Sequence, residues 1–205
     1  MFPDILSKEQ KELLPLMQQF RREFYLVGGT AIALQIGHRK SIDFDMFKLA
    51  NINAMRTLKK ISDAKKRYTI THRAVDQIHL ISDSVKITFF QYPYPIEAKM
   101  DFEGVFRMPD LITLAAMKAY ALGRRSKWKD YVDLYFLIRN HYTIEQISEK
   151  SDALFGQMFS KKLFQQQLAY HKDIDYTEPV EYLPGFDVDE NEVKEFLIDQ
   201  ALQGL

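Results

Sequence analysis

The amino-acid sequence predicts an α+β fold, in which a sheet-containing first half is followed by a helical second half. Between residues 67 and 92, three short segments rich in β-branched and aromatic residues follow one another, which is typical of a strand meander. From Pro109 onward, apolar residues recur every three to four positions, as they do in amphipathic helices. We therefore divide the 205 residues into a core over 1–105 and a helical region over 106–205.

Local patterns predict each element of the first half. Ser7 and Gln10 have the spacing of a capping box at a helix start, whereas Pro15 predicts a break or kink further along. The pair Asp83-Ser84 suits a hairpin turn between two strands. The expected elements are a helix over 7–22, a strand over 24–27, a helix ending at Gly37, a strand over 41–47, a helix over 51–64 and the strands RYTITHR, QIHLIS and VKITFFQY.

Five helices are expected in the second half. Pro109 and Asp110 are typical of a helix start, and Gly123 is expected to separate the first helix from the second. Thr143 and Gln146 have the spacing of a second capping box. The helices are expected over 109–125, over 126–140, from 143 onward, over 157–171 and over 190–203.

Composition excludes several classes of function. The 28 basic and 28 acidic residues give a formal net charge of zero, which argues against capture of nucleic acid by bulk charge but allows a local basic strip. The absence of cysteine excludes disulfides, thiolate catalysis and cysteine-ligated zinc. No segment has the pattern of a signal peptide or the length of an apolar membrane span, so we expect a cytoplasmic protein with no membrane partner.

Asp43 and Asp45 are the first candidates for chemistry. Residues i and i+2 of a strand point to the same face, so the two carboxylates lie together and repel each other unless a cation lies between them. Magnesium typically takes one or two protein carboxylates together with substrate phosphates. The alternative is an edge strand with two solvated aspartates, which is the more common meaning of an isolated Asp-x-Asp.

The glycines before this strand favour the metal interpretation. Gly28 and Gly29 lie between an expected strand and an expected helix, where backbone N–H groups and the helix N-terminus can bind phosphate oxygens. Thr30 adds a hydroxyl at the helix start. A Gly-Gly turn alone predicts no more than chain reversal. The order of strand, glycines, helix, basic turn and Asp-x-Asp strand predicts a nucleotide-phosphate site.

The spacing of Gly28-Gly29 and, after thirteen intervening residues, Asp43-Phe44-Asp45 resembles the signature of the polymerase-β-like nucleotidyltransferase superfamily. More narrowly, YLVGGTAIALQIGHRKSIDFDMF resembles the AbiEii/AbiGii-type toxin family of type IV toxin–antitoxin and phage-defence systems. The segments VKITFFQYPYP and AAMKAYALGRRSKWKDYVDLYFLI extend this resemblance over roughly residues 24–140. It implies a nucleotidyltransferase-type mixed β-sheet flanked by helices, with the helical half completing the active site.

The resemblance also implies roles for individual residues. Lys118 would contact a phosphate. One of the two aspartates Asp130 and Asp133 would orient Lys118 or Arg39, and the other would cap a neighbouring helix. The alternative for Lys118 is a solvated helix lysine. The implied set is Asp43, Asp45, Lys118 and Asp130 for catalysis, Asp43 and Asp45 for Mg²⁺ or Mn²⁺, and Gly28, Gly29, Thr30, Arg39, Lys40 and Ser41 for the nucleoside triphosphate.

One departure from the superfamily pattern concerns proton transfer. Many members carry a third carboxylate on a later strand, which acts as the general base for the attacking hydroxyl. Thr88 lies where this carboxylate is expected, and a threonine hydroxyl is no base. Asp45, Asp130 or a substrate phosphate remain candidates for the base.

The implied reaction transfers a nucleoside monophosphate from a nucleoside triphosphate to a hydroxyl of a tRNA 3′ end or of a protein. The basic residues Arg124, Arg125, Lys127 and Lys129 around Trp128 suit an RNA contact, or else a solvated helix start with Trp128 in the core. The resemblance further implies a toxin with a winged-helix antitoxin as partner. Two rivals stay open: a catalytically silent nucleotide- or partner-binding protein, and an antibiotic-type small-molecule nucleotidyltransferase, for which an acidic pocket is expected.

Overall fold

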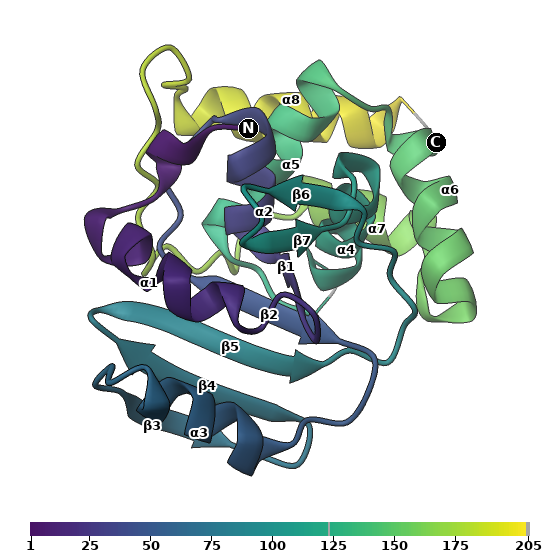
Figure 1. The fold of residues 1–205 in the computed structure, drawn as a ribbon. Helices are drawn as coiled ribbons and strands as arrows, with labels where there is room; N and C mark the ends of the chain where they lie inside the picture. The colour runs from purple at the N-terminus through teal and green to yellow at the C-terminus, as the bar shows by residue number, and fades with distance from the viewer. Residues whose placement is uncertain (123, 204–205) are drawn as a thin grey trace. The chain divides into compact units, whose positions relative to one another are not determined.

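The computed structural model describes residues 1–122 and 124–203 and divides into two compact units, Met1–Asp110 and Leu111–Leu205. The first unit carries a mixed β-sheet with helices, and the second is built from helices (Figure 1). The predicted α+β class is therefore confirmed.

The sheet of the first unit has five strands in the order β1-β2-β5-β4-β3. β2 and β5 are parallel and the other neighbours are antiparallel, so the sheet is mixed as expected. Asp83 and Ser84 both have positive φ and form the turn between β4 and β5, which confirms the predicted hairpin. A register shift between Ile70 and His72 interrupts the edge strand β3. The strands are β1 (Tyr25–Val27), β2 (Phe44–Lys48), β3 (Thr69–Arg73), β4 (Gln77–Ser82) and β5 (Val85–Gln91).

The two faces of this sheet differ in chemistry. Met46 of β2 and Phe89 of β5 are register partners and fully buried on one face. The ring of Phe89 lies 4.8 Å from the ring of Phe20 and 5.1 Å from that of Phe24, in the segment that follows α1 (Lys8–Gln18). In Figure 1, α1 is drawn over β2 and β5, and α3 (Ala54–Asp63) over β4 and β3. Because strand residues alternate, the residues between these apolar positions face the other side.

Two helix predictions in this unit hold in detail and one differs. The capping box of Ser7 and Gln10 is present, and α2 (Gly28–Ile36) ends at Gly37, whose φ is 71°. α1, however, continues through Pro15 and ends at Gln18, four residues before the expected end. A proline late in a short helix is compatible with helix on both sides, because it lacks only the one N–H donor and its ring disturbs only the preceding turn.

A second, two-stranded sheet was not expected from the sequence. It consists of β6 (Met100–Phe102) and β7 (Phe106–Met108), which pair antiparallel. The side chain of Asp101 accepts a hydrogen bond from the backbone N–H of Gly104 and so closes the turn between them. Strands of three residues are too short for an alternating pattern to be recognised.

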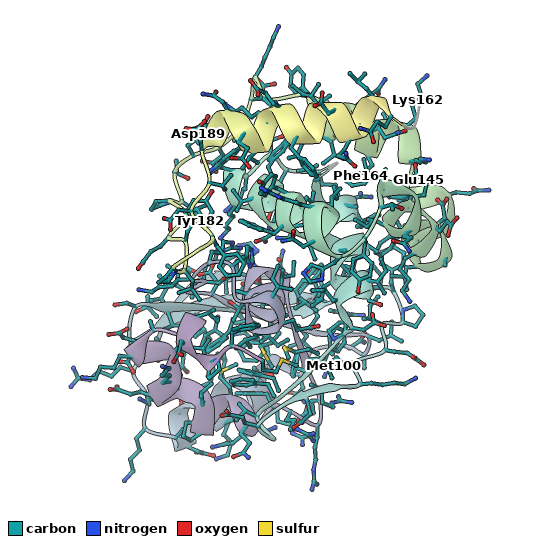
Figure 2. The ribbon with its side chains drawn as sticks, turned by 90° about the horizontal axis from the view of Figure 1, so that it is seen from above. Met100, Glu145, Lys162, Phe164, Tyr182 and Asp189 are labelled. Carbon is teal, nitrogen blue, oxygen red and sulfur yellow. The ribbon has the colours of Figure 1, made fainter. Side chains whose placement is uncertain are left out.

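The second unit contains the five expected helices. The capping box of Thr143 and Gln146 is confirmed, whereas the expected break at Gly123 lies outside the described residues. Figure 2 shows Asp189, the N-cap of the last helix, with Tyr182 in the loop that precedes it. In the described part of the chain, no helix is both long and apolar enough to span a bilayer. The helices are α4 (Leu111–Leu122), α5 (Trp128–Asn140), α6 (Ile144–Phe155), α7 (Lys161–Ala169) and α8 (Glu190–Leu202), with short 3₁₀ turns at Pro3–Ile5 and Gly156–Met158.

Candidate active site

The turn after β1 has the features of a phosphate-binding turn. β1 ends at Val27 and α2 begins at once with Gly28 and Gly29. No side chain caps the N-terminus of α2. The first N–H groups of a helix have no partner within the helix, and together with the helix dipole they favour an anion. The sequence prediction of a strand, two glycines and a helix is confirmed here.

The two glycines let charged side chains approach the backbone. A Cβ atom on Gly28 would overlap the carboxylate of Asp45, and one on Gly29 would overlap the guanidinium of Arg39. The same Cβ on Gly29 would lie 3.3 Å from the hydroxyl oxygen of Ser41. A carboxylate and a guanidinium therefore lie against one two-residue turn, and any side chain in that turn displaces one of them.

Hydrogen bonds fix the segment between α2 and β2 against this turn. The hydroxyl of Thr30 is hydrogen-bonded to the Ser41 hydroxyl, at 2.9 Å, and to the backbone carbonyl of Asp43. Nη1 of Arg39 donates to the carbonyl of Lys40 at 2.9 Å. Thr30, Arg39 and Ser41 are buried, while Lys40 is exposed. The structure thus brings together Gly28, Gly29, Thr30, Arg39 and Ser41, whereas the Lys40 residue is exposed.

Asp43 and Asp45, the two predicted metal ligands, lie at the start of β2. Asp43 directly precedes β2 and Asp45 lies within it, and both are half-buried. Among residues 1–122 and 124–203, no group of three or more histidine, cysteine, aspartate or glutamate side chains is placed to hold a metal ion. Two carboxylates from the protein are what magnesium commonly uses when substrate phosphates supply further ligands.

The register of β2 and β5 places Thr88 directly beside Asp45. Asp45 alternates with the buried Phe44 and Met46, so Asp45 and Thr88 share the face opposite the apolar core. Thr88, which the resemblance puts at the place of a third carboxylate, is thus a direct neighbour of Asp45.

In the second unit, Lys118 lies at the centre of a buried ion cluster. Its ammonium lies 2.7 Å from a carboxylate oxygen of Asp130 and 2.8 Å from one of Asp133, and its side chain is 4% exposed. Arg125 contacts Asp130 at 2.8 Å from the solvent side, with 49% of its side chain exposed. Lys118 is therefore no solvated helix lysine. Burial raises the pKa of Asp130, but the charges of Lys118 and Arg125 outweigh this, and the pKa lies below its ordinary value.

The basic residues near the start of α5 are engaged within their own unit. The guanidinium of Arg124 lies 3.7 Å from the ring centre of Tyr120, and Lys127 and Lys129 both contact Glu178. Burial raises the pKa of Glu178, but the two lysines lower it by more than burial raises it. The resulting pKa is about 2. Glu178 lies about fifty residues after the lysines, so the sequence offered no local signal for this contact.

Trp128, in the middle of this basic segment, is part of the packed interior. It is 7% exposed and lies between the rings of Tyr131, at 6.4 Å, and Tyr176, at 5.5 Å. Of the two interpretations that the sequence left open, the structure favours the packing role for Trp128 over base stacking.

Replacing Gly28 by alanine is expected to reduce any activity of this site well beyond its effect on stability. The φ of 71° disfavours alanine by about 1–2 kcal/mol, and the new methyl group displaces the Asp45 carboxylate. Gly104→Ala is the matched control, because Gly104 has a φ of 69° and open space around its Cβ position. Urea unfolding and activity assays should show similar destabilisation for both variants but an activity loss for Gly28→Ala alone. Equal activity in the two variants would contradict the close approach of Asp45.

Comparisons with known proteins match this chain in sequence and in fold. A family model described as nucleotidyl transferase AbiEii toxin, type IV TA system, matches residues 82–203. An uncharacterized protein of Aquifex aeolicus strain VF5, aq_aa25, is 35% identical over 146 residues, which are 66% of this chain and 68% of the relative.

Two solved structures share the fold. JHP933 from Helicobacter pylori has 16% identity and a TM-score of 0.62, over 97% of this chain and 92% of that chain. MenT4, the nucleotidyltransferase toxin Rv2826c of Mycobacterium tuberculosis H37Rv, has 14% identity and a TM-score of 0.62, over 96% and 82%. These structures show a common nucleotidyltransferase fold, and the family model covers more than half of the sequence. The chain belongs to the AbiEii family of nucleotidyl transferase toxins.

Proposed function

We propose that the protein transfers a nucleoside monophosphate from a nucleoside triphosphate to an acceptor hydroxyl and releases pyrophosphate. The observation that carries this proposal is the Gly28-Gly29 turn, which holds Asp45 and Arg39 against a helix N-terminus without a side-chain cap. Family membership supports the reaction class.

The residues of the first unit divide between phosphate and metal binding in this proposal. The backbone N–H groups of Gly29 and Thr30 bind phosphate oxygens, and Arg39 neutralises their charge. Ser41 holds Thr30 in place, and the exposed Lys40 contributes charge from the solvent side. Asp43 and Asp45 would hold Mg²⁺ or Mn²⁺, which when bound stabilises the charge that develops on the phosphates.

From the second unit we assign Lys118 and Asp130 to the reaction. An ammonium has three N–H donors, and those of Lys118 that contact Asp130 and Asp133 fix its position. We assign a further donor to a substrate phosphate, for which a lysine acts as a point charge. Asp130 positions Lys118 and does not itself act on the substrate.

The acceptor and the biological setting rest on the family resemblance. We propose the 3′ end of tRNA as the acceptor, with a protein hydroxyl as the second candidate. The resemblance also favours toxicity that a winged-helix antitoxin neutralises. Because Lys127 and Lys129 are paired with Glu178, RNA is expected to gain little from these two lysines.

Label transfer from each of the four nucleoside triphosphates to total RNA tests the proposal directly. We expect label on RNA from a preferred nucleotide, loss of transfer with EDTA, and recovery after addition of excess Mg²⁺ or Mn²⁺. Label on protein alone would identify a protein acceptor, and label on an added aminoglycoside alone would identify a small-molecule enzyme. Nucleotide binding without transfer to any of these acceptors would support the catalytically silent alternative and overturn the proposed reaction.

A further inference from the structure

Thr88 lies between an aspartate and a histidine on the same face of the sheet. Asp45 of β2 is the register partner of Thr88 in β5, and Thr88 is the register partner of His79 in β4. Directly opposed residues of neighbouring strands point to the same face, and strands lie about 4.8 Å apart. The Thr88 side chain therefore lies between the side chains of Asp45 and His79 on this face.

This face of the sheet is reachable from solvent at His79. Ile78 and Leu80, the neighbours of His79 in β4, are fully buried on the other face. His79 itself is half-buried, and Ile81, two residues further on the same face, is 43% exposed. An acceptor group can approach His79 along this side of β4.

The hydrogen bond of His79 determines which ring nitrogen accepts a proton. Nε2 of His79 lies 3.0 Å from the amide oxygen of Gln77, on the same strand face. An amide oxygen only accepts, so Nε2 carries the hydrogen and Nδ1 keeps its lone pair. Gln77 thus holds Nε2 and orients the ring, which leaves Nδ1 as the atom that accepts a proton. A base oriented by a third group in this way is typical of proton-transfer sites.

Burial and the neighbouring positive charges both lower the pKa of His79 and so favour its neutral form. Burial lowers the pKa of His79, and Lys86 and His72 lower it further. Lys86 lies on β5 two residues before Thr88, and His72 lies on β3 with its ring 5.3 Å from the His79 ring. Asp45 is separated from His79 by Thr88. At neutral pH, His79 is therefore unprotonated and able to accept a proton.

We propose that Thr88 and His79 form a proton relay for the acceptor hydroxyl. This inference rests on the proposed function. As the acceptor oxygen forms its bond to the α-phosphorus and the bond to the pyrophosphate oxygen breaks, the acceptor proton passes to the Thr88 hydroxyl. The hydroxyl proton of Thr88 passes to Nδ1 of His79, and the imidazolium later returns it to solvent. Threonine thus serves where a carboxylate base is absent, because a hydroxyl can accept and donate at once.

Four single variants test the relay by kcat for label transfer. Thr88→Val and His79→Asn are each expected to lower kcat by about 10²–10³-fold, within the range for general base catalysis. Thr88→Ser, which keeps the hydroxyl, and His72→Asn, which removes the neighbouring histidine, are expected to stay within a few-fold of wild type at pH 8. The double variant Thr88→Val/His79→Asn should be no slower than the slower single variant, since the two residues act as a unit.

The pH profile distinguishes this role from a structural one. Wild-type kcat/KM should fall as the pH drops through a pKa below that of a free imidazole, and this limb should be missing in His79→Asn. Thr88→Asp in the His79→Asn background should restore activity by supplying a carboxylate. If the wild-type protein transfers label, two outcomes would overturn the relay alone. One is a kcat of His79→Asn equal to that of the wild type. The other is a loss of kcat in the double variant equal to the product of the two single losses. Absence of transfer by the wild-type protein would instead overturn the proposed function.

Discussion

Replacing Asp45 or Asp43 by asparagine is expected to lower nucleotide transfer by at least about 10³-fold, because a metal ion held by both carboxylates contributes several kcal/mol to transition-state stabilisation. Asparagine keeps the size of the side chain but loses the charge. Asp45 lies directly against Gly28, so the neutral side chain also fits the turn without displacing it. Stability should change little, since both carboxylates are only half-buried.

Label transfer and urea unfolding measured on the same protein preparations check this expectation. Asp76→Asn is the matched control, because Asp76 is an exposed aspartate of the same unit between β3 and β4. It should transfer label at the wild-type rate. If the Asp43 and Asp45 variants both keep more than a tenth of wild-type activity, these carboxylates do not hold a catalytic metal.

Replacing Lys118 by methionine is expected to destabilise the second unit by about 3–5 kcal/mol, the usual cost of breaking a buried ion pair from one side. The substitution removes the ammonium that contacts both Asp130 and Asp133, and these two carboxylates are buried. Trp128 lies in this unit and is the single tryptophan, so its fluorescence during urea unfolding reports on the unit directly. Arg125→Met should cost less than about 1 kcal/mol, because an exposed partner contributes little.

The pH dependence gives this prediction a second readout. In the wild type, the lowered pKa of Asp130 stabilises the fold above the ordinary aspartate pKa, and this contribution is lost as the pH falls through the lowered value. In Lys118→Met, burial without the ammonium raises the carboxylate pKa values, so protonation relieves the penalty as the pH falls. The difference in unfolding free energy between variant and wild type should shrink from pH 7 to pH 5. A difference that is constant over this range would show that the loss is one of packing and not of charge.

The features that could be read from the sequence are those that neighbouring residues determine. The two capping boxes, the Gly28-Gly29 turn and the Asp83-Ser84 hairpin each depend on a few adjacent positions, and each is present. Asp43 and Asp45 were recognisable from their spacing, but the strand begins at Phe44 and not at Ser41 as expected, so Asp43 directly precedes it.

The features that escaped prediction depend on pairing between distant segments. The parallel pairing of β2 with β5 sets Asp45 directly beside Thr88, a register that the family resemblance did not give, although it pointed to Thr88 at the place of the third carboxylate. No local pattern specifies this parallel register, whereas the two-residue turn Asp83-Ser84 fixes the register of β4 with β5 and so sets Thr88 beside His79. The contact of Glu178 with Lys127 and Lys129 likewise joins residues about fifty positions apart, so a strip that suits RNA by composition is balanced by charge in the folded unit.

The irregular edge of the sheet bears on self-association. Every residue of β3 is exposed, and an exposed edge strand is a template on which another chain can add a strand. The shift between Ile70 and His72 interrupts the ladder within this strand, and the charged Arg73 ends it. A bulged, charged edge is a poor partner for a second strand, so concentrated solutions of this protein should resist edge-to-edge aggregation.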